Sequence, residues 1–317
     1  MIPLPVANTL GRRLFSSSAS AMQIKNVTVV GSGLMGAGIV QVAAQSMFNV
    51  TMVDLTPDTL KKGEALINSS LGRIARKKFA SDTEAQAAFI KDVWTRIQLS
   101  TDSAQAVQDS DLVVEAIVEN IDVKRSLFKS LDAAAPSRTI FTSNTSSLPI
   151  QAIASATQRG DRFGGLHFFN PVPQMKLVEV IKTKDTSSVV FDELVAFSKA
   201  VGKEPVACGD TPGFIVNRLL VPYMMEALRL VERGDANMKD VDTAMKLGAG
   251  YPMGPFELMD YVGLDTLKFI NDGWNKNSPL SGDSLVAPSQ MLDDLVKQGR
   301  LGVKSGRGFY EYPAKKK

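Results

Sequence analysis

Cysteine is almost absent from this sequence, because Cys208 is the only one among 317 residues. A single thiol excludes an internal disulfide framework and is typical of proteins in a reducing compartment. We expect Cys208 to be a small, buried, apolar side chain. Long apolar runs are also missing, since none reaches the ~20 residues that a membrane-spanning helix needs. The sequence therefore predicts a soluble protein with no stable membrane insertion.

A basic surface with interleaved aromatic residues is lacking as well. The formal net charge is +3, and the excess comes from Arg12, Arg13 and the lysines at 315–317, at the two ends of the chain. Nucleic-acid binding is therefore not indicated. We also expect no metal site.

Acidic residues are missing from the beginning of the chain, since no Asp or Glu precedes Asp54. Residues 1–22 contain two arginines and a serine run, a composition that resembles a mitochondrial presequence. Processing is expected after Phe15. The sequence thus predicts a presequence at 1–22 and a protein of the mitochondrial matrix. A disordered cytosolic extension is the alternative.

A strand of β-branched residues at 27–30 is followed by spaced glycines and then by the start of a helix. Gly31 permits a tight turn, Gly33 lets the backbone approach a pyrophosphate, and Gly36 lets the helix pack closely on the strand. The phosphates would lie at the helix N-terminus. A glycine-rich turn without a ligand is the structural alternative. The predicted phosphate-binding segment is Gly31, Ser32, Gly33, Leu34, Met35 and Gly36.

A second apolar strand, at residues 50–53, leads into Asp54. Asp54 lies 18 residues after Gly36 and 23 after Gly31, which brackets the separation of about 20 expected for the acid that binds an adenine ribose. Its charge would repel a 2′-phosphate, and the next two residues supply no arginine to bind one. The sequence therefore predicts NAD as the cofactor rather than NADP.

Strands alternate with helices over most of the chain, which predicts a Rossmann-type, doubly wound α/β sheet. The expected strands are residues 27–30, 50–53, 97–99, 112–116, 139–142, 162–168, 176–181 and 204–207, with a helix at 122–134. Beyond a breaker cluster at 209–213 the pattern changes to helices. These are expected at 214–233, 238–247, from 256 onward and at 289–298, with one further strand pattern at 308–312.

We therefore divide the chain into a presequence (1–22), an NAD-binding domain (23–209) and an all-helical substrate and dimerisation domain (210–317). The helical unit is small and apolar for its size, so we expect it to bury surface against a second subunit. Packing on the first domain alone is the alternative.

Residues 57–93 predict a polar helical hairpin inserted after the second strand. Six basic residues and one acid lie between positions 61 and 78, a pattern that is more often a solvated helix face than a binding site. A hairpin at this point of a nucleotide-binding fold can overhang the cleft, however. It would suit a phosphate-rich handle on the substrate.

His167 is the only histidine in the chain. Among apolar residues a lone imidazole is more often a buried structural group than a catalyst. In residues 176–182 the period-two alternation puts Glu179 on the apolar face, where a carboxylate needs a partner. If the two segments pair as neighbouring strands, Glu179 orients His167 as a general base. An enzyme that oxidises an alcohol needs such a base, because the hydroxyl proton must leave as the hydride departs.

Two further polar residues are candidates for the site. Ser146 follows a strand and precedes a helix, where capping of the helix is the structural explanation. Asn217 interrupts an apolar helix start near the expected domain junction, where a locally satisfied surface amide is equally consistent.

With these motifs the chain resembles the short-chain L-3-hydroxyacyl-CoA dehydrogenases of fatty-acid β-oxidation, over about residues 24–312. The motifs that carry the resemblance are Gly31-Ser-Gly-Leu-Met-Gly, Ser143-Asn-Thr-Ser-Ser, His167-Phe-Phe-Asn-Pro, Gly209-Asp-Thr-Pro-Gly-Phe and Tyr251-Pro-Met-Gly-Pro-Phe-Glu-Leu.

The resemblance implies that His167 is the general base, that Glu179 holds it, and that Ser146 and Asn217 contact the reacting end of the substrate. It also implies a homodimer that forms through the helical domain. The implied cofactor contacts, besides the glycine segment and Asp54, are Glu119, Lys124, Ser146, Asn170 and Lys304. The implied contacts to coenzyme A are Ser70, Lys77 and Ser146.

The predicted activity is the reversible, NAD-dependent oxidation of an (S)-3-hydroxyacyl-CoA to the 3-oxoacyl-CoA. One alternative is a 3-hydroxy sugar-acid dehydrogenase of the same fold, which the basic hairpin disfavours because a sugar acid has no remote phosphates. The other is a non-catalytic NAD-binding protein, which would need neither His167 nor Glu179.

Overall fold

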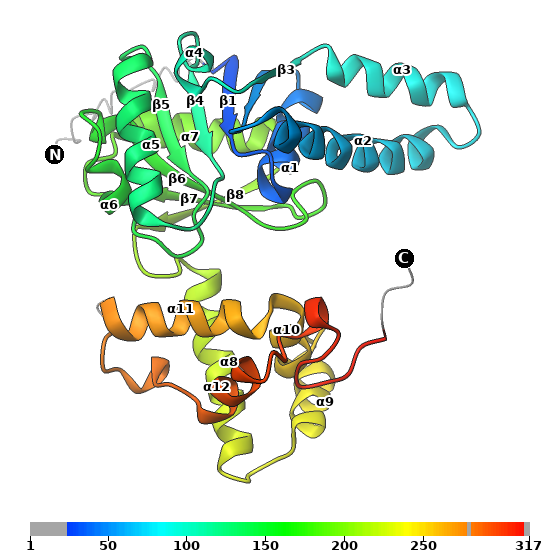
Figure 1. Cartoon of the computed structure of the whole chain (residues 1–317), viewed down its shortest axis with the longest axis vertical. Helices are drawn as coiled ribbons and strands as arrows, with labels where there is room; N and C mark the ends of the chain where they lie inside the picture. The colour runs from blue at the N-terminus through cyan, green and yellow to red at the C-terminus, as the bar shows by residue number, and fades with distance from the viewer. Residues whose placement is uncertain (1–23, 278–279, 314–317) are drawn as a thin grey trace, which may run out of the picture.

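The computed structural model describes residues 24–277 and 280–313, so the predicted presequence at 1–22 lies outside the described residues. An eight-stranded sheet runs through the first two thirds of the chain in the order β3-β2-β1-β4-β5-β6-β7-β8 (Figure 1). Its strands are β1 (Asn26–Val30), β2 (Asn49–Val53), β3 (Ile97–Ser100), β4 (Leu112–Glu115), β5 (Ile140–Ser143), β6 (Phe163–Phe168), β7 (Leu177–Lys182) and β8 (Glu204–Gly209).

The first six strands are parallel, whereas β7 runs antiparallel to β6 and β8 runs parallel to β7. The chain moves outward from β1 to β3 and then returns to β4 beside β1. This reversal of strand order creates a crevice at the carboxyl ends of β1 and β4, where ligands of doubly wound sheets bind.

Helices cover both faces of the sheet, and two apolar cores result. One core joins β1, β2 and β7 to α1, α2 and α7, and the other joins β1, β4 and β5 to α5 and α6. The predicted doubly wound α/β fold is therefore confirmed. The helices are α1 (Leu34–Gln45), α2 (Pro57–Phe79), α3 (Thr83–Trp94), α4 (Ser103–Ala106), α5 (Ile121–Ala134), α6 (Ile150–Ala154) and α7 (Ser188–Ala200), with a 3-10 turn at Gly160–Arg162.

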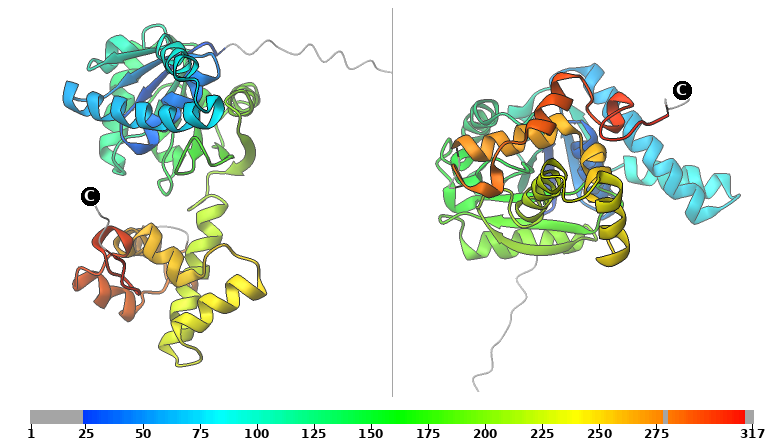
Figure 2. Two further views of the ribbon diagram at one scale, coloured as in Figure 1. Left: turned by 90° about the vertical axis from the view of Figure 1, so that its right-hand side faces the viewer. Right: turned by 90° about the horizontal axis from the view of Figure 1, so that it is seen from below.

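The segment between β2 and β3 forms the predicted helical hairpin. Thr56 caps α2 and Asp82 caps α3. Leu60, Ile67 and Leu71 on α2 are buried in the core that contains β1, β2 and β7. Figure 1 and the right-hand view of Figure 2 show the far end of the hairpin projecting away from the sheet.

After β8 the described chain is helical, apart from short turns and isolated bridges. α8 crosses from the sheet to a third apolar core, and Figure 1 shows this helical part below the sheet. Its elements are α8 (Val216–Glu232), α9 (Met238–Gly248), α10 (Pro255–Val262), α11 (Leu264–Asn277) and α12 (Gln290–Lys297), with 3-10 turns at Ser284–Val286 and Val303–Ser305. No helix among the described residues is long and apolar enough to cross a membrane.

Two expectations need correction. Residues 308–312 form no strand, because the backbone N–H groups of Phe309 and Tyr310 donate to the Asp260 carboxylate and only isolated bridges remain. Cys208 is not buried, since it lies half-exposed on the edge strand β8. Its partial burial and the nearby Glu179 and Asp210 carboxylates still raise the pKa of the thiol to about 11, so the thiolate is disfavoured.

Candidate active site

The turn between β1 and α1 requires glycine at two positions. Gly31 has a φ of +107°, and a Cβ on it would lie 2.4 Å from the carbonyl oxygen of Ala116. A Cβ on Gly36 would lie 1.8 Å from the carbonyl oxygen of Gly31. Larger residues at either position would push β1, β4 and the start of α1 apart. Met35, in the same segment, packs against the core.

A cavity of about 430 Å³ opens at the crevice between β1 and β4. Gly31, Gly33 and Asp54 line it, together with the exposed apolar side chains of Leu55 and Val118. Gly33 is the N-cap of α1 and offers no side chain, so the first N–H groups of the helix have no side-chain cap. Free N–H groups, an apolar wall and a carboxylate fit the pyrophosphate, adenine and ribose of a dinucleotide.

Asp54 is held in place by its neighbours. One carboxylate oxygen accepts hydrogen bonds from the Ser32 N–H (2.7 Å) and hydroxyl (2.6 Å), and the other accepts from the Leu55 N–H (2.7 Å). Partial burial raises the pKa of Asp54, but these hydrogen bonds outweigh it and hold the pKa below its ordinary value. The carboxylate is therefore charged at neutral pH, and it lines the cavity.

His167 and Glu179 form the predicted pair. They are directly opposite each other in the antiparallel register of β6 and β7, and Nδ1 lies 2.6 Å from Oε2 of Glu179. Both residues are buried, and the rings of Phe169 and Phe214 pack against the imidazole. The ring orientation is thus fixed, with Nδ1 bound to Glu179 and Nε2 left for another partner.

Glu179 has a second function in the fold. Its other oxygen accepts hydrogen bonds from the N–H groups of Ile215 (3.0 Å) and Val216 (2.9 Å), at the start of α8. Burial raises the pKa of Glu179, but the contacts with His167 and these N–H groups outweigh that effect and keep the pKa below its ordinary value. An ionised carboxylate therefore joins the imidazole to the first turn of the helical part.

Ser146 and Asn217 are brought together as well. The Asn217 amide donates to the backbone carbonyl of Ser146 at 3.2 Å, which joins the segment after β5 to α8. Ser146 caps no helix, because its N–H donates to Glu119 at 3.2 Å and α6 begins only at Ile150. Neighbouring Asn144 accepts a hydrogen bond from the N–H of Phe168, next to His167.

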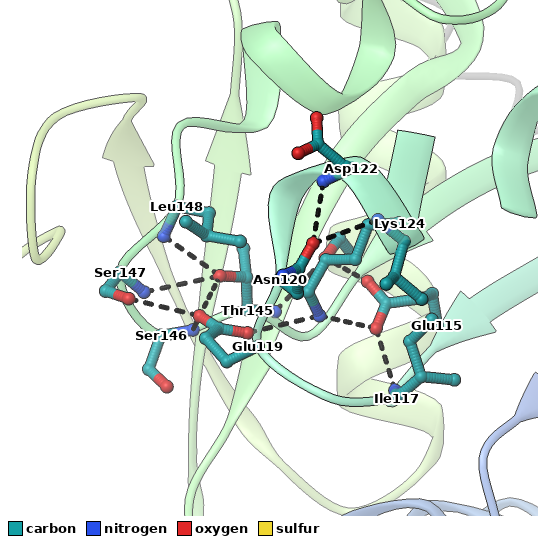
Figure 3. Close-up of polar contacts among 12 residues, drawn as sticks. Glu115, Ile117, Glu119, Asn120, Asp122, Lys124, Thr145, Ser146, Ser147 and Leu148 are labelled. Carbon is teal, nitrogen blue, oxygen red and sulfur yellow. Dashed lines mark hydrogen bonds and ion pairs between the residues drawn. The ribbon is translucent and has the colours of Figure 1, made fainter. Parts of the chain in front are cut away.

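Glu119 and Lys124 belong to one polar network (Figure 3). One Glu119 oxygen accepts hydrogen bonds from the Thr145 hydroxyl, the Ser146 N–H and the Ser147 hydroxyl, and the other lies 3.1 Å from Lys124 Nζ. Burial raises the pKa of Glu119, but Lys124 and these donors outweigh it, so the pKa lies below its ordinary value. Lys124 is buried and directed at carboxylates of the chain.

Glu115, the other partner of Lys124, was not among the predicted residues. The signal was present in the sequence, because a carboxylate ends the apolar strand Leu-Val-Val-Glu and a buried charge needs a partner.

A smaller cavity of about 100 Å³ lies between α1, α2 and the segment after β6. It brings together Leu34, Ser70, Arg73 and Asn170. Lys77 does not line this cavity. It lies on the same face of α2 as Ser70, two turns farther along the hairpin, and is exposed.

Lys304 lies apart from these groups. Its ammonium contacts both carboxylate oxygens of Asp265 (2.5 and 2.7 Å) in the helical part. The structure therefore does not bring it to the Asp54 cavity. Among the residues that the structure describes, no group of three or more His, Cys, Asp and Glu is placed to hold a metal ion.

Comparison with known proteins decides the family. Residues 26–211 match the family described as 3-hydroxyacyl-CoA dehydrogenase, NAD binding domain, and residues 213–312 match its C-terminal domain. The chain belongs to the 3-hydroxyacyl-CoA dehydrogenase family. As a member it is an oxidoreductase that uses NAD to oxidise 3-hydroxyacyl-CoA substrates, as the sequence predicted.

Individual relatives agree with this assignment. The chain is 60% identical to the human protein named hydroxyacyl-coenzyme A dehydrogenase, mitochondrial. The alignment spans 297 residues and covers 94% of each chain. It is 43% identical to a probable 3-hydroxybutyryl-CoA dehydrogenase of Bacillus subtilis, over 93% of this chain and 99% of that protein. The crystal structure of (S)-3-hydroxybutyryl-CoA dehydrogenase from Ralstonia eutropha superposes with a TM-score of 0.85 at 38% identity, over 92% and 99% of the two chains.

The Asp54 carboxylate leads to a prediction about cofactor choice in this dehydrogenase. Asp54→Ala is expected to weaken NADH binding by about 10–100-fold, the magnitude of a hydrogen bond to a charged group, without creating affinity for NADPH. Fluorescence titration with each cofactor measures both values. Asp58→Ala is the matched control, because this exposed carboxylate four residues later does not line the 430 Å³ cavity. Equal use of NADH and NADPH by the wild type would contradict the assigned contact.

Proposed function

We propose that this dehydrogenase converts (S)-3-hydroxyacyl-CoA to 3-oxoacyl-CoA reversibly in β-oxidation, with His167 as the general base. The observation that supports the proposal is the buried pair in which Glu179 Oε2 holds His167 Nδ1 at 2.6 Å. Gly31, Gly33 and Asp54 in the crevice would hold NAD, which would supply the acceptor for the hydride of C3. His167 takes the proton of the C3 hydroxyl at Nε2 in oxidation and returns it in reduction. Replacement of His167 by Gln, described in the Discussion, tests this assignment.

Glu179 keeps the proton of the neutral imidazole on Nδ1, so that Nε2 presents a lone pair to the substrate. Ser146 and Asn217 contact the reacting end of the acyl group in this proposal. Three contacts support this assignment. Ser146 and Asn217 are hydrogen-bonded to each other. Asn144, two residues before Ser146, binds the strand that carries His167, and Val216, next to Asn217, binds Glu179.

Coenzyme A binds along α2 in this proposal, with Ser70 in the small cavity near Asn170 and Lys77 on the exposed face beyond it. The cationic character of α2 in this region suits the adenosine phosphates. Glu119, Lys124, Asn170 and Lys304 remain proposed cofactor contacts. For Lys304 this requires the ammonium to leave Asp265.

Loss of Lys77 is expected to affect the substrate and to spare the cofactor. Lys77→Ala should raise KM for an acyl-CoA about twofold to fivefold, as expected for an exposed charge pair with phosphate, and should leave the Kd for NADH unchanged. The effect should shrink for an acyl-pantetheine substrate, which lacks the adenosine phosphates. Lys61→Ala, an exposed lysine on the other side of the same helix, is the control. An unchanged KM in Lys77→Ala would show that the basic face of α2 is a solvated surface and not a binding site for coenzyme A.

We further propose two domains, 23–209 and 210–317, and a homodimer that forms through the second. The helical part exposes Leu219, Leu247, Tyr261 and Phe269 to between 58% and 83%, and exposed apolar side chains of this size favour burial against another subunit. Light scattering of the purified enzyme would overturn the proposal if it found only monomers.

We also propose the mitochondrial matrix as the location. The acid-free composition of residues 1–22 and the mitochondrial relatives support it. Cell fractionation and N-terminal sequencing test the proposal, which predicts a mature chain that begins after Phe15 or a few residues further on.

A further inference from the structure

A carboxylate at the end of β4 is buried without access to solvent. Glu115 is 0% exposed. One oxygen accepts hydrogen bonds from the Ile117 N–H (2.8 Å) and Lys124 Nζ (2.6 Å), and the other accepts from the Ser143 hydroxyl (2.5 Å). A buried charge with three donors is costly to form and is retained only where its partners are well fixed.

Its partners belong to two segments that border the site. Ile117 lies in the segment after β4 that lines the 430 Å³ cavity. Ser143 ends β5, directly before the segment that carries Ser146. Glu115 therefore ties together the walls of the cofactor crevice and the candidate substrate-binding segment.

Lys124 extends this connection, because its single ammonium bridges Glu115 and Glu119. Figure 3 shows Lys124 between the two carboxylates, with Thr145, Ser146 and Ser147 around Glu119. One oxygen of Glu119 is thus held by the Lys124 ammonium, which Glu115 also binds. The other oxygen accepts hydrogen bonds from three consecutive residues of the segment after β5.

From this segment two hydrogen bonds reach the catalytic pair. Asn144 binds the N–H of Phe168, next to His167, and the Ser146 carbonyl binds the Asn217 amide on α8. The first turn of α8 is in turn bound by Glu179. The buried charges on β4 and α5 and the imidazole on β6 are therefore connected through one continuous set of contacts.

We propose that Glu115 is a positioning residue of the dehydrogenase, which acts through Lys124 and Glu119 to hold Ser146 in register with His167. The proposal rests on the proposed function, in which Ser146 contacts the reacting end of the substrate. Glu115 itself touches neither the substrate nor the cofactor. Its effect is on geometry, and a displacement of catalytic groups by about 1 Å can cost up to ~100-fold in rate.

Glu115→Gln tests the charge with little change in shape. The amide oxygen can still accept from Ile117 and Lys124, and the amide nitrogen can donate to Ser143, so the fold is retained. The ammonium of Lys124 then has one anionic partner instead of two and is drawn to Glu119. We expect kcat to fall about tenfold, with a smaller change in the Kd for NADH.

Two comparisons separate positioning from stability. Asp132→Asn weakens a matched ion pair at the other end of α5, where Asp132 lies 2.5 Å from Arg159, and it should lower the melting temperature without changing kcat. In a Ser146→Ala background the effect of Glu115→Gln on kcat should shrink to less than about twofold, because the positioned side chain is gone.

Wild-type kcat in folded Glu115→Gln, or an undiminished tenfold loss in the Ser146→Ala background, would overturn the proposal. If Glu115→Gln fails to fold, Ser143→Ala removes one hydrogen bond to Glu115 and the acceptor of the Thr145 N–H. It should also decrease kcat, with the same dependence on Ser146. These outcomes are distinct from failure of the proposed function, which would show in His167→Gln and not in the variants of this network.

Discussion

His167→Gln is expected to lower kcat by about 10²–10⁴-fold with little change in NADH affinity, because it removes the group that takes the hydroxyl proton. Gln can keep a hydrogen bond to Glu179 but has no atom that accepts a proton at neutral pH. The cavity beside Asp54 is lined by other residues, so cofactor binding should persist. Steady-state kinetics and fluorescence titration with NADH measure the two quantities.

The chain contains no second imidazole that could substitute for His167. The decrease should therefore be present in oxidation and in reduction, since the atom that accepts the proton in one direction donates it in the other. A thermal unfolding curve serves as the control for folding. A folded, NADH-binding His167→Gln enzyme with most of the wild-type kcat would show that the histidine is a structural group of the core.

The features that could be predicted from the sequence are those encoded by local spacing. The glycine segment and Asp54 lie within one strand-helix-strand unit, so their order along the chain determines where they meet. Glu179 could be placed on the apolar face of its strand because side chains alternate strictly along a strand. The structure then shows that this strand is the neighbour of the strand that carries His167.

Other features depend on contacts that the order of residues does not reveal. The sequence placed Lys304 at the cofactor by resemblance alone, whereas its ammonium pairs with Asp265 in the helical part. α7 was not predicted, because its apolar positions 190, 194 and 197 are mixed with β-branched residues that favour strands. The network around Glu115 joins β4, α5 and the end of β5, and only the tertiary structure shows that these three meet.

Glu179→Gln is expected to lower kcat almost as far as His167→Gln does, although it leaves the imidazole in place. The amide oxygen can still accept the N–H groups of Ile215 and Val216, which leaves the amide nitrogen to donate to Nδ1 of His167. That bond forces the proton of the neutral imidazole onto Nε2, where no lone pair is then left for the substrate. Loss of the correct tautomer costs about 10²–10⁴-fold in rate.

The double variant of His167 and Glu179 should be no slower than either single variant, since both remove one catalytic unit. Glu204→Gln, at an exposed position on the neighbouring strand β8, is the control and should keep wild-type kinetics.

Stability gives a second measurement for Glu179. Because its pKa in the folded state lies below the ordinary 4.5, the carboxylate stabilises the fold above pH 4.5, and this contribution is lost as the pH falls through the folded-state pKa. The difference in free energy of unfolding between wild type and Glu179→Gln should thus be constant near neutral pH and shrink in acid. A difference that grows on acidification, or a variant that retains wild-type kcat, would show that Glu179 does not orient the base as an ionised carboxylate.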